Sequence, residues 1–200
     1  GQWLSVPAEH RALRLTAGPS PSSIVQGVRL FGEKVPAEME CGYATTVPAM
    51  LATFEGRPWS PRPQAGAFLR QDQQRFAEAP TAIRATRTRS DLYIAVEAGE
   101  FSPDVMIADL SQRDAPLWRQ ESVEVWIQPE GQLPLRLIAS PLGTQYDSQV
   151  NDAGWDGAWE VTTLKTASGW NVLFRIPMEL IGEMKRGSSL RLNIVRNRHG

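Results

Sequence analysis

Short runs in which apolar and polar residues alternate one by one dominate the second half of this sequence. In the clearest run, residues 91–97, the apolar side chains Leu92, Ile94 and Val96 share one face of an extended chain. Successive side chains of a strand point to opposite faces of a sheet, so a period of two predicts strands with one buried face. Further runs that read as strands lie at 81–88, 122–128, 135–140, 158–165, 170–176 and 190–195.

The connections between these runs are short and carry turn signals. Arg89 to Asp91, Pro129 to Gly131 and residues 166–169 read as hairpin turns, and residues 178–182 as a single helical turn. Residues 65–79 contain good helix formers but a poor apolar stripe, which fits a loop or a short helix. The predicted fold class is therefore all-β, an antiparallel β-sandwich of the immunoglobulin-like or jelly-roll type with short helical turns.

The length of 200 residues favours one domain with an additional segment. We expect residues 51–200 to form the sandwich. Residues 1–50 are expected to be an N-terminal β-hairpin extension, with strands near 12–17 and 23–31, or the tail of a preceding domain. The alternative that the chain is tethered within a larger multidomain protein stays open.

Composition argues against several functional classes. The formal net charge is -1, so the overall electrostatic field of the protein does not attract nucleic acid or an anionic membrane. No apolar run approaches the ~20 residues that a membrane-spanning helix needs, so no membrane insertion is expected. The two histidines, His10 and His199, lie near the ends, which argues against a histidine-based metal or acid–base site. Cys41 is the single cysteine and has no partner for an internal disulfide.

An ordered set of motifs resembles the carbohydrate-binding modules of family 9, within the DOMON-like superfamily. The most recognisable string runs from Trp118 to Trp126, where a Trp precedes an acidic-Ser-Val-Glu-Val-aromatic strand. The order continues through Leu135-Arg136-Leu137 to Leu192-Asn193-Ile194, and the resemblance covers about three-quarters of the chain. It implies a secreted or periplasmic, non-catalytic binder of mono- or oligosaccharides, associated with polysaccharide degradation by glycoside hydrolases.

A saccharide site needs a flat aromatic ring against the apolar face of the sugar and polar groups that satisfy its hydroxyls. Trp118 is the first candidate for the stacking ring, because it lies at a loop edge and the resemblance implies a sugar-stacking Trp there. The alternative is that Trp118 is a buried core residue at the end of a strand. Trp155, in a loop rich in Gly and Asp, is the candidate for a second stacking surface. Trp126, Trp159 and Trp170 are expected to be structural.

Glu124 and Arg136 are the candidate polar groups. A turn centred near Glu130 would place them directly opposite each other on one face of an antiparallel hairpin. The resemblance implies that both contact sugar. The alternative is a simple cross-strand ion pair.

Oxygen ligands for structural Ca²⁺, a property of the family, are available in Asp147, Asp152 and Asp156. Their spacing matches no compact calcium loop, so we favour turn-capping carboxylates and expect no other cofactor. Nothing in the sequence positions a catalytic pair of carboxylates, so the chain is not expected to be an enzyme, and an accessory domain of a glycoside hydrolase is the alternative.

Two other functions remain open at this stage. One is a haem-binding sandwich of the same superfamily, for which Met106 and His10 are available as ligands. The other is a structural or protein-interaction domain without a small ligand. The chain also stops before the last strand of the family and its second stacking Trp. We hypothesise that residues 12–31 cover the sheet edge left there.

Overall fold

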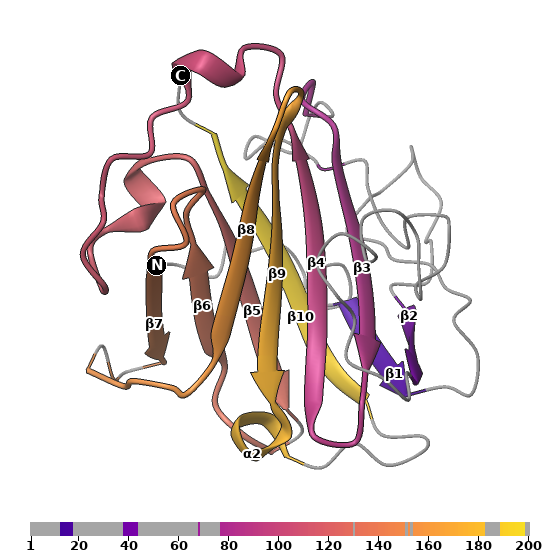
Figure 1. Ribbon diagram of the computed structural model, residues 1–200. Helices are drawn as coiled ribbons and strands as arrows, with labels where there is room; N and C mark the ends of the chain where they lie inside the picture. The colour runs from indigo at the N-terminus through magenta and orange to yellow at the C-terminus, as the bar shows by residue number, and fades with distance from the viewer. Residues whose placement is uncertain are drawn as a thin grey trace.

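The structure is a computed structural model that describes residues 13–17, 38–43, 68, 77–129, 131–150, 152, 154–182 and 189–198. Two layers of strands pack face to face, with β8, β9, β4 and β3 in front of β7, β6, β5 and β10 (Figure 1). In chain order the elements are β1 (Leu13–Ala17), β2 (Glu38–Tyr43), β3 (Thr81–Arg87), β4 (Asp91–Gly99), η2 (Pro103–Val105), η3 (Leu117–Arg119), β5 (Ser122–Pro129), β6 (Leu135–Ala139), β7 (Gln145–Gln149), β8 (Glu160–Thr166), β9 (Gly169–Pro177), α2 (Met178–Ile181) and β10 (Ser189–Asn197). The predicted all-β sandwich is confirmed.

The two layers belong to one continuous ladder of hydrogen-bonded strands. Its order is β7-β6-β5-β10-β1-β2-β3-β4-β9-β8. Pairing is antiparallel except where β2 lies parallel to both β1 and β3. The N-terminal strands β1 and β2 therefore join the first layer, β7-β6-β5-β10, to the second, β3-β4-β9-β8.

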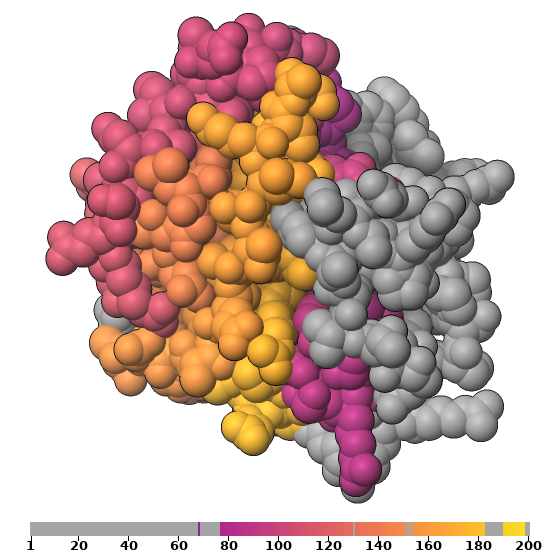
Figure 2. Space-filling view, viewed as in Figure 1, coloured from indigo at the N-terminus to yellow at the C-terminus, as the bar shows by residue number. Residues whose placement is uncertain are grey.

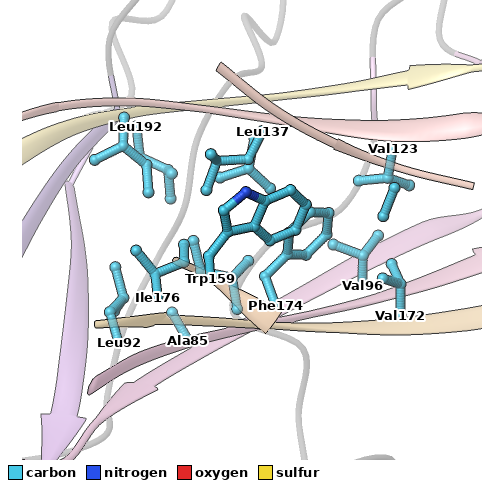
Figure 3. Packing of buried hydrophobic residues seen from close by; sticks show 14 of the residues in the cluster. Ala85, Leu92, Val96, Val123, Leu137, Trp159, Val172, Phe174, Ile176 and Leu192 are labelled. Atoms are coloured by element: carbon cyan, nitrogen blue, oxygen red, sulfur yellow. The ribbon is translucent and has the colours of Figure 1, made fainter. Parts of the chain in front are cut away.

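The core lies between the layers and is built from the alternating residues that the sequence indicated. Val123, Leu137 and Leu192 of the first layer face Leu92 and Ile176 of the second (Figure 3). All five side chains are almost completely buried, and burial of each such side chain contributes about 1.5–3 kcal/mol. Every second residue of these strands is thereby left for the outer faces.

Trp159 and Trp170 are core residues, as predicted. Trp159 is 4% exposed and stacks on Phe174 with ring centroids 5.6 Å apart and an interplanar angle of 14° (Figure 3). Trp170 is completely buried. Both indoles fill the space between the layers and are not available to a ligand.

The edge of β10 is covered by β1, which pairs with it antiparallel from Leu13↔Leu192 to Thr16↔Ser189. The other edge of β1 is occupied by β2, a strand that the sequence patterns did not predict. Both edges of β1 are thus paired with other strands. Residues 18–37, which include the hairpin partner expected at 23–31, lie outside the described residues.

A long connection, residues 100–121, carries the chain from β4 in the second layer to β5 in the first. It runs along the upper and left-hand rim of the molecule in Figure 2. Its last turn is η3, which packs against β5 and β6. Leu117 in η3 is completely buried, and Ser122 Oγ donates a hydrogen bond of 2.9 Å to its carbonyl oxygen. This anchor fixes the position of the next residue, Trp118.

No helix in the described ranges is long and apolar enough to cross a membrane.

Candidate functional site

The outer face of the first layer carries two rows of side chains that cross four strands. Strand register aligns the first row as Asn193 (β10), Trp126 (β5), Arg136 (β6) and Ser148 (β7). The second row, one step along the strands, is Val195, Glu124, Ile138 and Tyr146. We call these eight residues, together with Trp118, the outer face. Its aromatic and charged residues gather on β5, β6 and β7.

Three aromatic rings surround the guanidinium of Arg136. Its Cζ atom lies over the rings of Trp118, Trp126 and Tyr146, at 4.9, 5.1 and 5.6 Å from the ring centroids. Trp118 also meets Tyr146 edge to face, with centroids 5.0 Å apart. Trp118 is half-buried on the outer face and does not belong to the core cluster. The alternative that it plugs the core is therefore wrong.

Glu124 holds the guanidinium from the side. Arg136 donates from Nε to Oε2 at 2.9 Å and from Nη2 to Oε1 at 3.0 Å. Trp126 Nε1 donates to Oε2 at 3.0 Å, and Asn197 Nδ2 donates to Oε1 at 2.8 Å. The Glu124 side chain is only 6% exposed and that of Arg136 17%. A paired charge held this firmly keeps one geometry, because both partners are largely removed from water.

The register of the β5–β6 hairpin differs from the predicted one. Arg136 stands opposite Trp126, and Glu124 stands opposite Ile138. The prediction of directly opposed residues was wrong, because the turn is centred on Gly131, at φ 72°, and not on Glu130. The pair still shares one face, and the long arginine reaches Glu124 along the diagonal, within the range of such contacts.

Several polar atoms of the outer face stay open to solvent. Among the described residues, no hydrogen bond uses Nη1 of Arg136, Nε1 of Trp118 or the hydroxyl of Tyr146. None of these atoms is among the buried polar atoms that lack a partner. Two donors and a hydroxyl thus border the exposed part of an indole ring, which is the combination that a sugar requires.

Trp155 lies on the other side of the first layer from Trp118. It is half-buried, packs against the core cluster and rests on Gly157, where an added Cβ would lie 2.3 Å from its Cη2 atom. Trp118, by contrast, lies over Arg136 on the outer face. The structure therefore does not bring the two candidate stacking residues together.

The candidate calcium ligands are divided between two places. Arg113 Nη2 contacts both Asp147, at 2.6 Å, and Asp156, so one guanidinium bridges this pair. Asp152 instead accepts a hydrogen bond from the backbone N–H of Gly154 at 3.0 Å, as expected of a turn-capping carboxylate. The described part of the chain contains no group of three or more His, Cys, Asp or Glu side chains placed to hold a metal ion.

Asp147 is completely buried on the inner side of β7. Burial raises the pKa of its carboxyl above the ordinary value, although the backbone N–H of Gly157, at 2.6 Å, and Arg113 both favour the charged form. Arg113, Asp147 and Asp156 together tie the connection before β5 to the connection after β7. These two carboxylates thus hold the two connections together through Arg113.

A buried ion network closes one end of the sandwich. Glu121 Oε1 accepts hydrogen bonds from Arg196 at 2.8 and 2.9 Å and from Trp170 Nε1 at 3.0 Å. Next to it, Glu100 is bound by Arg198 at 2.6 and 2.7 Å. These bonds from Arg198 are the main reason that the pKa of Glu100 is lowered to about 2. Glu100, Glu121 and Arg196 are buried in this network, whereas the Arg198 side chain is 47% exposed.

Of the two residues named for a haem site, the structure describes Met106. Met106 is partly buried and packs against the hydrophobic core. His10 lies outside the described residues.

Comparison with solved structures finds proteins that are similar to this chain. A "putative carbohydrate-binding protein" from Bacteroides uniformis matches with a TM-score of 0.59 at 14% identity, over 78% of this chain and 84% of that chain. The chain shares the fold of that protein. Two structures of a carbohydrate-binding module of family 9 from Caldicellulosiruptor kristjanssonii, in complex with cellotriose and with glucose, match at 14% identity with TM-scores of 0.40 and 0.41. They cover 58% of this chain and 66% and 67% of theirs.

No family model and no curated protein sequence matches the chain. The match to the protein from Bacteroides uniformis confirms the resemblance indicated by the motifs at the level of the fold. Trp126, Tyr146 and Asn197 were missed as members of the candidate site. For Trp126 the signal was present, since its place on β5 puts it on the same face as Glu124.

Proposed function

We propose that the chain is a non-catalytic carbohydrate-binding module whose outer face binds a mono- or oligosaccharide beside Trp118. The observation that carries the proposal is the guanidinium of Arg136, held among three aromatic rings and against Glu124 outside the core. Fold alone does not determine function, so the argument depends on these side chains.

The chemistry of the outer face supports this ligand class. The exposed part of the Trp118 ring provides an apolar plane for the C–H face of a pyranose. The open donors of Arg136 and Trp118 and the hydroxyl of Tyr146 lie around that plane and match the hydroxyl oxygens of a sugar. Because neighbouring side chains already hold Arg136, ordering it costs the ligand little.

The placement of carboxylates supports binding without catalysis. Glycoside hydrolysis requires a pair of carboxyl groups on either side of the scissile bond. On the outer face, as far as the structure describes it, Glu124 is the one carboxylate, and its oxygens are taken up by protein donors. Asp147 is buried on the core side, Asp156 lies in an exposed loop, and both are bound to Arg113.

A secreted or periplasmic location, attachment to a larger protein and an accessory role in polysaccharide degradation complete the proposal. Their support is the motif resemblance alone. Structural calcium is a weaker part of it, since Arg113 occupies the position between two of the three candidate ligands.

The direct test is calorimetric titration with a panel of sugars. Glucose and cellotriose are the first probes, followed by galactose, xylose and glucuronic acid. We expect wild type to bind at least one of them and Trp118→Ala to lose about 2 kcal/mol, or roughly thirtyfold in affinity. Phe101→Ala is the matched control, because Phe101 is 67% exposed at the start of the connection whose last turn carries Trp118, and its removal should leave binding unchanged. Absence of binding at millimolar concentrations of every sugar would overturn the proposal.

A further inference from the structure

The four hydrogen bonds to Glu124 use its whole accepting capacity. Each oxygen of an ionised carboxylate has about two lone-pair sites, so the group accepts about four hydrogen bonds. Oε2 accepts from Trp126 and Arg136, and Oε1 accepts from Arg136 and Asn197, all between 2.8 and 3.0 Å. With 6% of the side chain exposed, no lone pair is left for a sugar hydroxyl.

The same contacts determine which atoms of Arg136 remain available. Nε and Nη2 lie on one edge of the planar guanidinium, and both point at Glu124. Covalent geometry therefore directs Nη1 away from the carboxylate, and the second N–H of Nη2 is also unused by it. The neighbouring rings of Trp118 and Trp126 limit rotation of the guanidinium. The acid thus fixes the direction in which arginine can donate.

We propose that Glu124 is a positioning residue that orients Arg136 and does not itself contact the ligand. Asn197 supports the same arrangement from β10, since Nδ2 also donates to Ser122 Oγ at 3.1 Å. This inference deepens the proposed function and rests on it for the ligand, but it replaces the expectation that both charged residues touch sugar. The contact made through this pair is then donor-only, and the ligand atom facing Nη1 is an acceptor oxygen.

A double-mutant cycle tests the inference. The probe is cellotriose or, if wild type prefers another member of the panel, that sugar. We expect Glu124→Gln to weaken binding about tenfold, since one amide oxygen cannot replace two carboxylate oxygens. In an Arg136→Met background the same change should alter affinity less than twofold, because Glu124 acts through the arginine. An equal loss in both backgrounds would mean that Glu124 binds the sugar directly.

A second measurement needs no sugar and keeps the test decisive. The Nε–H signal of Arg136 in a ¹⁵N–¹H correlation spectrum is assigned by its loss in Arg136→Lys. We expect a protected signal in wild type, broadening or loss in Glu124→Gln, and no change in Glu179→Gln, a control at an exposed residue of α2. An unchanged signal in folded Glu124→Gln would overturn the positioning role. If wild type binds no sugar but Glu124→Gln releases Arg136, the proposed function fails and the anchoring of Arg136 stands.

Discussion

The indole Nε1 of Trp170 donates a hydrogen bond of 3.0 Å to Glu121, and both side chains are completely buried. Trp159, in the same core, has a buried Nε1 without a hydrogen-bond partner in the described structure. The two tryptophans therefore separate the effect of ring volume from that of a hydrogen bond to a buried carboxylate.

Replacement of each tryptophan by Phe should reveal this difference. Both variants lose a similar ring volume, but Trp170→Phe also removes a donor from Glu121. We expect Trp170→Phe to lower the free energy of unfolding by about 1.5–3 kcal/mol more than Trp159→Phe, the range for hydrogen bonds to charged groups. Urea unfolding monitored by circular dichroism measures both values. Equal losses would show that Glu121 does not depend on the hydrogen bond from Trp170.

Glu100 should make stability depend on acid pH. Its pKa is lowered from an ordinary 4.5 to about 2, mainly because Arg198 donates to it. A depressed pKa in the folded state contributes stability that is present above the unfolded pKa and is lost as pH falls through the folded one. We expect a loss of roughly 3 kcal/mol between about pH 4.5 and pH 2.

Unfolding of Glu100→Gln as a function of pH checks this contribution. The variant should be less stable than wild type at pH 6, and its stability should fall less steeply on acidification. Glu179→Gln, at an exposed position, is the control and should follow the wild-type curve. Parallel curves for Glu100→Gln and wild type would assign the acid sensitivity to other groups.

Trp155 should be displaced by a single methyl group. A Cβ at position 157 would lie 2.3 Å from the Trp155 ring, whereas at Gly154 its nearest neighbour would be 3.5 Å away. Overpacking of this kind costs about 1–3 kcal/mol. We expect Gly157→Ala to shift the tryptophan fluorescence to the red and to destabilise the fold by about that amount. Gly154→Ala should do neither. Sugar affinity should be unchanged in both, because Trp155 lies on the side of the sheet away from Trp118.

Tyr146 should affect sugar binding mainly through its ring. Its edge-to-face contact with Trp118 and its place beside Arg136 help to hold the other two side chains. Such aromatic contacts contribute about 0.5–1.5 kcal/mol beyond buried area. Tyr146→Ala should therefore weaken binding about fivefold, and Tyr146→Phe less, by the value of one hydrogen bond at most. A larger loss in Tyr146→Phe than in Tyr146→Ala would contradict this role.

Alternation of apolar residues was sufficient to predict most of the sandwich, because both layers bury one face. It failed for β7, whose inward residues Gln145, Asp147 and Gln149 are polar. There Arg113, 34 residues before Asp147, supplies the partner, and a contact at that separation leaves no periodic signal. Since β7 was not predicted, Tyr146 was not placed on the outer face either.

The candidate site was predicted in its residue types but not in its arrangement. Glu124 and Arg136 were placed on the correct face, and the offset of two residues followed from a turn centred one position too early. Trp126 was expected to be structural, although its ring lies against Arg136 and its Nε1 bonds Glu124. Such contacts depend on the length of the side chains and the orientation of the rings. Neither can be read from the positions of the residues along the strands.

The strands β1 and β2 connect the two layers by backbone hydrogen bonds. A fragment beginning after residue 43 would leave the layers joined by side-chain packing and connecting loops, with the unpaired edges of β10 and β3 facing solvent. Edges of this kind recruit strands from other molecules. We therefore expect the N-terminal segment to limit self-association. In size-exclusion chromatography at the same concentration, the shortened protein should form larger assemblies than the full chain.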